Sequence, residues 1–306
     1  MLLKSDNQFQ SSTKGNGIMS IATEKVSVTA ESASRTIQTS RYKIHYYEAG
    51  AGHPVILLHG SGPGATGWSN FRPNIEPLSR RFHVHAVDMP GWGESETQND
   101  TIGRDHPADV IALMDELGIE QAALVGNSMG GMTSVATAVR FPERVSHLVS
   151  MGAPAPGLDL FSPGGGFSEG LKVLFHAYRE PTPENMKRLV QIMCFDQSMA
   201  TDELAGLRSA AALAHTEHLD SWNTLWDSPQ PPNPYFGLLP ELEKLTVPTL
   251  ALHGRDDRVV SFEHSLRFLA AVPTSRAHII NRCGHWLQIE HADEFNRIIT
   301  DFVTNN

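Results

Sequence analysis

The stretch Ala122-Ala-Leu-Val-Gly-Asn-Ser-Met-Gly-Gly131 decides the fold. Its apolar start predicts a buried strand, and the Gly-x-Ser-x-Gly pattern is typical of a nucleophile elbow, where a strand turns sharply into a helix with serine at the apex. Side chains at Gly126 and Gly130 would clash across such a turn. The amphipathic segment Met132–Arg140 supplies the helix, which directs its first backbone N–H groups toward a pocket at Ser128. The pattern alone also fits a surface turn, but the flanking strand and helix favour the elbow.

The composition is that of a globular protein, with 306 residues, 40% of them hydrophobic, and a formal net charge of −10. This charge argues against a general nucleic-acid surface, which needs a basic stripe, and an anionic substrate would need a locally placed cation. The two cysteines, Cys194 and Cys283, indicate no disulfide framework and fit a reducing compartment. No apolar run reaches the length of a membrane span, and the N-terminus lacks a secretory signal. We therefore expect a cytoplasmic protein that binds a small molecule and neither nucleic acid nor membrane.

The chain divides into a polar start, a core in two pieces and an insertion. Residues 1–34 are rich in polar side chains and predicted to be disordered, and Met19 is an alternative start. Residues 35–154 and 237–306 alternate strand and helix patterns, which predicts an α/β fold with a mainly parallel sheet covered by helices on both faces. The predicted strands are Tyr42–Tyr47, Val55–His59, His83–Asp88, Ala123–Gly126, Val145–Met151, Thr249–Gly254 and Ala277–Ile280. The predicted helices are Asn70–Leu78, Pro107–Leu117, Met132–Arg140, Glu263–Ala271 and Ala292–Val303.

Residues 155–236 interrupt this alternation, because they carry helix patterns with little strand signal. Two stretches rich in Gly and Pro lie near its ends, Ser162–Gly166 and Pro229–Pro234. The predicted helices between them are Glu169–Arg179, Pro183–Met193 and Thr201–Ala214. The region follows the predicted strand Val145–Met151. We therefore expect a helical lid over the carboxyl ends of the core strands, where open α/β sheets bind their ligands.

A serine hydroxyl is a weak nucleophile near neutral pH and needs a positioned base. Among fifteen histidines, His285 lies just after the last predicted strand, in a loop that can carry the ring back over the sheet edge toward Ser128. We interpret His59 as a support for a loop and His253 as a structural residue at a strand end. His285 is therefore the predicted base.

Two aspartates, Asp256 and Asp257, lie just beyond a predicted strand end and could orient that base. A carboxylate partner fixes the tautomer of the imidazole and stabilises the imidazolium. We select Asp257 and keep Asp256 as the second choice, because a turn or cap role suits Asp256 better. The chain order Ser, Asp, His is that of the α/β-hydrolases.

An oxyanion hole needs two backbone donors. One donor is predicted to be the N–H of Met129, directly after the nucleophile, and the other the N–H of Ser61 in the glycine-rich stretch His59–Gly64. Such a loop can also hold a phosphate, but the chain has neither Gly-x-Gly-x-x-Gly nor a P-loop lysine. Zinc-type spacing such as His-Glu-x-x-His is also absent from the sequence, so we expect neither a metal nor a cofactor.

Three motifs give the chain a resemblance to a known family. They are Leu57–Phe71, Gly126–Gly131 and Cys283–Trp286 together with Glu290–Asn296. They resemble the meta-cleavage product hydrolases, α/β-hydrolases that cut C–C bonds in ring-opened aromatic compounds. The likeness runs from about residue 37 to residue 303 and includes the lid, and the first motif is much more specific than the elbow alone.

The resemblance implies further site residues. In this family a lid arginine holds the dienoate carboxylate, and the segment Phe195–Arg208 matches that pattern and points to Arg208. The residues Asn70, Asn127 and Trp286 match polar groups around the same end of the substrate. An arginine suits a carboxylate ligand in an acidic chain because its guanidinium can bind bidentately. The family commonly forms homo-oligomers, so this chain is a possible homo-oligomer.

The implied reaction is hydrolysis of a 2-hydroxy-6-oxo-2,4-dienoate to a 2-hydroxypenta-2,4-dienoate and a carboxylic acid. Expulsion of a carbanion is prohibitive unless it is delocalised, so we expect the substrate to ketonise first, promoted by His285 and Arg208. Ser128 then attacks the C6 carbonyl, and either an acyl-enzyme or a gem-diol follows. The candidates for the pocket around the C6 substituent are Phe161, Phe167, Leu174, Met193 and Trp222, which fit the core of the lid at least as well.

Two other functions are compatible with the same sequence motifs. A carboxylesterase or lactonase would use the same triad, but it would not need the arginine and asparagine cluster. A non-catalytic ligand receptor with the hydrolase fold is a second alternative. A haloalkane dehalogenase is disfavoured because residue 128 is serine and not aspartate.

Overall fold

A computed structural model describes residues 27–98, 103–155, 160, 166–228 and 238–306. Its centre is an eight-stranded sheet with the strand order β1-β2-β4-β3-β5-β6-β7-β8. The strands are Ser34–Gln38 (β1), Lys43–Gly50 (β2), Pro54–Leu58 (β3), His83–Val87 (β4), Ala122–Asn127 (β5), Val145–Met151 (β6), Thr249–Gly254 (β7) and Ser275–Ile280 (β8). The pairs β1–β2 and β2–β4 are antiparallel, and all other pairs are parallel. The predicted α/β class and the mainly parallel sheet are confirmed.

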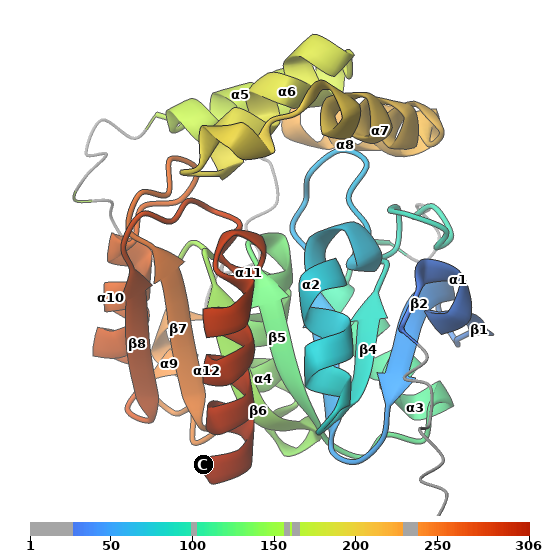
Figure 1. Ribbon diagram of the computed structural model, residues 1–306. Coiled ribbons are helices and arrows are strands. Elements are labelled where there is room, and N and C mark those ends of the chain that lie inside the picture. The colour runs from blue at the N-terminus through green and yellow to red at the C-terminus, as the bar shows by residue number, and fades with distance from the viewer. Residues whose placement is uncertain (1–26, 99–102, 156–159, 161–165, 229–237) are drawn as a thin grey trace, which may run out of the picture.

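Helices cover both faces of the sheet (Figure 1). They are Ala30–Ala33 (α1), Gly67–Ser79 (α2), His106–Glu116 (α3), Met129–Arg140 (α4), Glu169–Arg179 (α5), Pro183–Met193 (α6), Asp202–Leu213 (α7), Thr216–Trp226 (α8), Leu239–Leu242 (α9), Glu263–Ala271 (α10), Leu287–Glu290 (α11) and Ala292–Asn305 (α12). Among the described residues, no helix is both long and apolar enough to cross a membrane.

The two faces of the sheet bury separate hydrophobic cores. Successive side chains of a strand point to opposite faces, so Leu124 of β5 belongs to the core that includes residues of α3, α4 and α10. Val125 belongs to the core that includes residues of α2 and α12. This is why β5 is apolar at successive positions: a strand buried on both faces has no solvent side. The parallel strands thus end together at one edge, where the functional loops emerge.

The helices α5–α8 lie together over one end of the sheet (Figure 1). The first three begin with hydroxyl caps, because Ser168, Thr182 and Thr201 each accept a hydrogen bond from a backbone N–H in the first turn of their helix. The predicted lid helices are therefore present, with α7 one residue shorter at each end. The helix α8 lacks a hydroxyl cap, its N-cap residue being His215, and it was not predicted from the sequence.

The N-terminal region differs from the prediction of disorder over residues 1–34. Residues 1–26 lie outside the described part, but Ala30–Ala33 forms a helical turn and Ser34 begins β1. A reciprocal capping box joins Thr29 and Ser32, each side chain accepting a bond from the backbone N–H of the other. The polar residues Thr29 and Ser32, whose type is common in disordered segments, therefore stabilise a helical turn.

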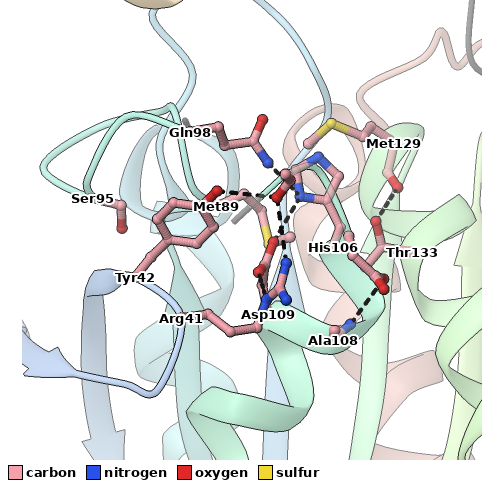
Figure 2. Close-up of polar contacts among 12 residues, drawn as sticks. Arg41, Tyr42, Met89, Ser95, Gln98, His106, Ala108, Asp109, Met129 and Thr133 are labelled. Atoms are coloured by element: carbon pink, nitrogen blue, oxygen red, sulfur yellow. Dashed lines mark hydrogen bonds and ion pairs between the residues drawn. The ribbon is translucent and has the colours of Figure 1, made fainter. Parts of the chain in front are cut away.

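A buried ion pair ties the start of β2 to α3. Arg41 Nε donates to Asp109 Oδ1 at 2.5 Å, and the side chain of Asp109 is almost fully buried. Arg41 and the hydroxyl of Tyr42 also both donate to the carbonyl of Gly103. Figure 2 shows that Arg41, Tyr42 and Asp109 lie near the first turn of α4, which contains Met129. The cluster therefore anchors α3 where it packs against the helix that follows Ser128.

The elbow stores backbone strain. Ser128 has φ 53° and ψ −115°, a region that residues other than glycine rarely adopt. The two glycines make this turn possible, since a Cβ on Gly126 would lie 2.0 Å from the carbonyl oxygen of Gly130, and a Cβ on Gly130 would lie 2.0 Å from that of Leu58. The predicted clash is confirmed, and it comes from backbone atoms that cannot move aside.

Replacing Gly126 with alanine should therefore prevent the elbow from forming. We expect Gly126→Ala to lower the free energy of unfolding by about 3 kcal/mol or more, or to abolish folding. The matched control is Gly206→Ala in α7, where a Cβ meets no atom within 4 Å, and where the change should be stabilising by up to about 1 kcal/mol. Urea denaturation of both variants measures the difference, and equal midpoints would contradict this account of the elbow.

Candidate active site

Ser128 lies between β5 and α4, at the carboxyl edge of the sheet. Its N–H donates to the carbonyl of Met151 at 2.8 Å, which holds the elbow against β6. Core and lid residues enclose a small cavity beside it, of about 20 Å³. The predicted site residues that line this cavity are Ser61, Asn70, Asn127, Ser128, Arg208, His285 and Trp286. Residues far apart in the sequence therefore meet at one place.

The predicted base and its carboxylate are in contact. His285 Nδ1 lies 2.7 Å from Asp257 Oδ2, and both side chains are buried. An ionised carboxylate can only accept, so Nδ1 of His285 carries the proton and Nε2 is left with a free lone pair. This is the tautomer that a general base needs.

A further set of donors fixes the Asp257 carboxylate. Its Oδ1 accepts the N–H groups of Val259 and Val260 at 2.7 and 3.0 Å. Its Oδ2 also lies 3.3 Å from Nε2 of His253, whose Nδ1 is 2.8 Å from Ser265 Oγ. Burial alone would raise the pKa of Asp257, but the neighbouring His285 and the hydrogen bonds from both imidazoles hold it well below its usual range. The carboxylate is therefore ionised, and His253 has the structural role expected.

The second-choice carboxylate does not reach the base. The backbone N–H of Asp256 donates to the carbonyl of Cys283, while its Oδ2 is buried and makes no hydrogen bond. The geometry thus favours Asp257. Within the described residues, no hydrogen bond joins the Ser128 hydroxyl to His285, although both line the cavity. Catalytic hydrogen bonds are often long in a site without substrate and tighten when it binds.

The two predicted oxyanion donors, Ser61 and Met129, both lie near Ser128. Met129 is the first residue of α4, so its N–H has no acceptor within the helix. Ser61 lines the cavity. Two side chains donate hydrogen bonds to carbonyl groups of the loop that carries Ser61. Tyr178 donates to the carbonyl of Ser61 at 2.5 Å, and Trp92 donates to the carbonyl of Gly62 at 3.2 Å. These two carbonyl bonds hold the loop in place beside the cavity.

His59 supports the same loop, as predicted. Its Nδ1 is 2.8 Å from the carbonyl of Gly60, and its Nε2 is 3.0 Å from the N–H of Met89. One partner can only accept and the other only donate, so these contacts define a single neutral tautomer. Burial lowers the pKa of His59, which agrees with a neutral structural ring.

Arg208 is buried at the boundary between α7 and the core. Its Nη2 donates to the carbonyl of Pro63 at 3.3 Å, and its guanidinium lies 4.8 Å from the ring centre of Trp286. In the described part of the chain it forms no ion pair, and its Nε has no hydrogen-bond partner. Burial lowers the pKa of Arg208 to about 10, so it still carries a charge at neutral pH. A buried cation without a counterion costs several kcal/mol, which an anionic ligand would offset.

The other predicted polar residues surround the cavity. Asn127 donates from Nδ2 to the carbonyls of Met151 and His285, while its Oδ1 is buried without a partner. Asn70 in α2 uses its Nδ2 on Thr66 and Ser69. Both amides thus keep an oxygen for another group, and Trp286 contributes one ring face to the guanidinium.

Sequence reasoning missed the role of Glu290. Its Oε1 accepts the N–H groups of Phe195 and Asp196 from the lid, and its Oε2 accepts that of Gly284 at 2.6 Å. One carboxylate therefore joins the loop of His285 to the lid. Glu290 stands in a motif used for the resemblance, but its partners are backbone groups, which leave no signal in the sequence.

The candidates for the substituent pocket separate into distinct groups. Leu174 and Met193 line the cavity, together with Val259, which was not predicted. Phe167 is half exposed and packs on Phe175, and Trp222 stacks on Tyr178 within the lid. Phe161 lies outside the described residues.

Comparison with known proteins assigns most of the chain to one fold family. The family model for the alpha/beta hydrolase fold matches residues 53–292. A 2-hydroxy-6-oxononadienedioate/2-hydroxy-6-oxononatrienedioate hydrolase of Cupriavidus pinatubonensis is 42% identical over 271 residues, which cover 87% of this chain and 92% of the relative. A 2-hydroxy-6-oxo-6-phenylhexa-2,4-dienoate hydrolase of Burkholderia cepacia is 40% identical over 269 residues, which cover 87% and 93%.

A solved structure gives the same result in three dimensions. A meta-cleavage product hydrolase from Pseudomonas fluorescens IP01 superposes with a TM-score of 0.79 at 34% identity, covering 88% of this chain and 97% of that protein. The similarity therefore extends over the lid as well as the core.

The contact between His285 and Asp257 predicts a selective effect of removing its charge. We expect Asp257→Asn to slow covalent labelling of Ser128 by a fluorophosphonate probe by roughly 10³- to 10⁴-fold, because an amide at this position can enforce the wrong imidazole tautomer. Asp256→Asn is the matched control and should label at nearly the wild-type rate. The opposite ranking of the two variants would move the triad to Asp256.

Proposed function

The chain belongs to the meta-cleavage product hydrolases of the α/β-hydrolase fold, which are C–C bond hydrolases, and we propose that Ser128, His285 and Asp257 cleave a 2-hydroxy-6-oxo-2,4-dienoate in the cavity beneath the lid. The products of this reaction are a 2-hydroxypenta-2,4-dienoate and a carboxylic acid. Sequence identity of about 40% to two hydrolases of such dienoates supports the substrate class. The geometry of the site supports the roles of the individual residues.

Arg208 binds the carboxylate of the dienoate in this proposal. It is the charged group that lines the cavity without a counterion among the described residues, and a guanidinium can pair with a carboxylate through two parallel hydrogen bonds. Asn70 and Asn127, which line the same cavity, supply polar groups for the 2-hydroxy end. Their Oδ1 atoms are free to accept from the enol hydroxyl.

The C–C bond breaks after the substrate has been converted into its keto form, which can accept the electron pair of that bond. Proton transfer, assisted by His285, converts the 2-hydroxydienoate into its keto form, so that the bond between C5 and C6 can break with the electron pair delocalised into the departing fragment. Ser128 transfers its proton to His285 as it attacks C6. The N–H groups of Ser61 and Met129 hold the oxyanion. The departing dienolate takes up a proton, and water then releases the acyl group as a carboxylic acid.

The observation that best supports this function is that Arg208 lies without a counterion, among the described residues, in the cavity lined by Ser128 and His285. An esterase or lactonase needs the nucleophile, the base and the oxyanion hole, but its leaving group does not require a buried cation. Burying Arg208 without a counterion costs stability, so its presence is explained best by an anionic substrate.

Substrate entry requires movement of the lid side chains. The cavity of about 20 Å³ holds roughly one water molecule, far less than a dienoate. The cavity wall combines Leu174 and Met193 from the lid with Val259 from the core, so separation of lid and core enlarges it.

We also propose that the enzyme works in the cytoplasm on a small anionic substrate. Both cysteines, Cys194 and Cys283, are free and buried, which fits a reducing compartment. Cell fractionation followed by immunoblotting tests the location.

A coloured 2-hydroxy-6-oxodienoate tests the reaction directly. We expect the wild-type protein to bleach it with formation of both products, and Ser128→Ala to retain binding while turnover falls by several orders of magnitude. A panel of compounds that differ at C6 then defines the preferred substituent. Fast hydrolysis of simple esters with no bleaching would instead identify an esterase, and an unchanged output in Ser128→Ala would identify a receptor.

The role of Arg208 predicts a change in KM with a defined pH dependence. We expect Arg208→Met to raise KM for the dienoate by about 10- to 100-fold, since a charge-assisted contact of about 1.5–3 kcal/mol is lost. In the wild type, KM should rise as the pH passes about 10, where the guanidinium loses its proton. Arg188→Met, on the exposed side of the lid, is the matched control. An unchanged KM in Arg208→Met would remove the carboxylate site from this position.

A further inference from the structure

Two strands bring a glutamate and two histidines together at a place remote from the cavity. Glu48 lies on β2, and His83 and His85 lie on β4 with their side chains on one face. Glu48 and His85 are direct partners in the antiparallel register. Glu48 Oε1 lies 2.8 Å from Nε2 of His83 and 3.9 Å from Nε2 of His85. One carboxylate oxygen therefore faces both imidazoles.

The separations match those of ligands around one small cation. Zn²⁺ binds imidazole nitrogen at about 2.0–2.1 Å and carboxylate oxygen at about 2.0–2.2 Å, so tetrahedral ligand atoms lie about 3.4 Å apart. The observed 2.8 and 3.9 Å lie on either side of this value, and all three ligand atoms are within 4.8 Å of one another. Small side-chain rotations would bring them around a common centre.

The surroundings leave these atoms available. Arg35 Nε pairs with the other oxygen of Glu48, Oε2, at 3.2 Å, so it orients the carboxylate and leaves Oε1 to the imidazoles. His85 is buried and directs Nε2 toward Glu48, while its other ring nitrogen, Nδ1, has no hydrogen-bond partner in the described part of the chain. His83 and Glu48 are each about one-third exposed, which gives an ion a path from solvent. Water can then complete the coordination, as in zinc sites with three protein ligands.

We propose that Glu48, His83 and His85 form a binding site for a divalent transition-metal ion of the zinc type. Imidazole suits zinc, copper and nickel, and a His₂Glu set is a known zinc ligand combination. Each ligand sits on a paired strand, so the site is largely preformed. The ion would clamp β2 to β4, the strand at which the described sheet changes from parallel pairing with β3 to antiparallel pairing with β2.

This site is independent of the catalytic residues. His83 is the first residue of β4, whereas Ser128, Asp257 and His285 follow the carboxyl ends of their strands. The ion therefore takes no part in the hydrolytic step. The sequence contains only a His-x-His pair here, and the third ligand comes from a strand 35 residues earlier, so it is the strand pairing that assembles the set.

The test is titration of the chelator-treated, full-length protein with Zn²⁺, followed by calorimetry and by thermal unfolding. We expect one saturable site and a rise in Tm with Zn²⁺ concentration. Titration with Co²⁺ should give the visible absorption of a tetrahedral centre. Both Glu48→Gln and His83→Asn should weaken binding by at least about tenfold, because each removes one of three protein ligands.

His53→Asn is the matched control, since His53 forms another histidine pair with His147, at 6.0 Å between ring centres. This variant should bind Zn²⁺ like the wild type. Circular dichroism of the metal-free variants shows whether they remain folded, and dienoate turnover should be unchanged in each. The absence of saturable binding, unaltered affinity in folded Glu48→Gln and His83→Asn, or loss of binding in His53→Asn would each overturn the site.

Discussion

A guanidinium buried without a carboxylate partner is the interaction around which this active site is organised. Arg208 lies under the lid, close to the ring of Trp286 and hydrogen-bonded to the carbonyl of Pro63. Burial of a charge without a counterion destabilises the protein, and in the proposed function the carboxylate of the substrate offsets this cost. The binding energy of the substrate carboxylate can then hold the reacting C6 carbonyl next to Ser128. In the proposed function, this cation distinguishes the site from that of a general serine hydrolase.

The catalytic residues are held mostly by backbone groups. The carbonyl of Met193 accepts the N–H groups of both His285 and Trp286, and Glu290 accepts N–H groups from the lid and from the loop of His285. The lid therefore contributes to the position of the base as well as to the cover of the cavity.

The sequence predicted the features that depend on local pattern. The elbow follows from the spacing of Gly126, Ser128 and Gly130, and both faces of β5 are buried as its continuous apolar run indicates. The contact of His285 with Asp257 followed from chain order and strand ends. These signals are short in range, or they rest on the rule that parallel strands end at a common edge.

What the sequence could not predict depends on partners that leave no pattern. The helix α8 has no hydroxyl cap, and the support of Glu290 comes through backbone N–H groups. The capping box of Thr29 and Ser32 was hidden in a polar segment that matches the composition of disorder. The cluster of Glu48 with two histidines exists only because β2 pairs with β4 in one register. Each of these features depends on which residues become neighbours in the folded chain, and the residue types alone do not reveal this.

The most direct test is a crystal structure of Ser128→Ala bound to a 2-hydroxy-6-oxo-2,4-dienoate. We expect the substrate carboxylate to lie within hydrogen-bond distance of the Arg208 guanidinium, with the C6 carbonyl oxygen directed at the N–H groups of Ser61 and Met129. A carboxylate bound elsewhere, with Arg208 turned to solvent or paired with a protein carboxylate, would contradict it.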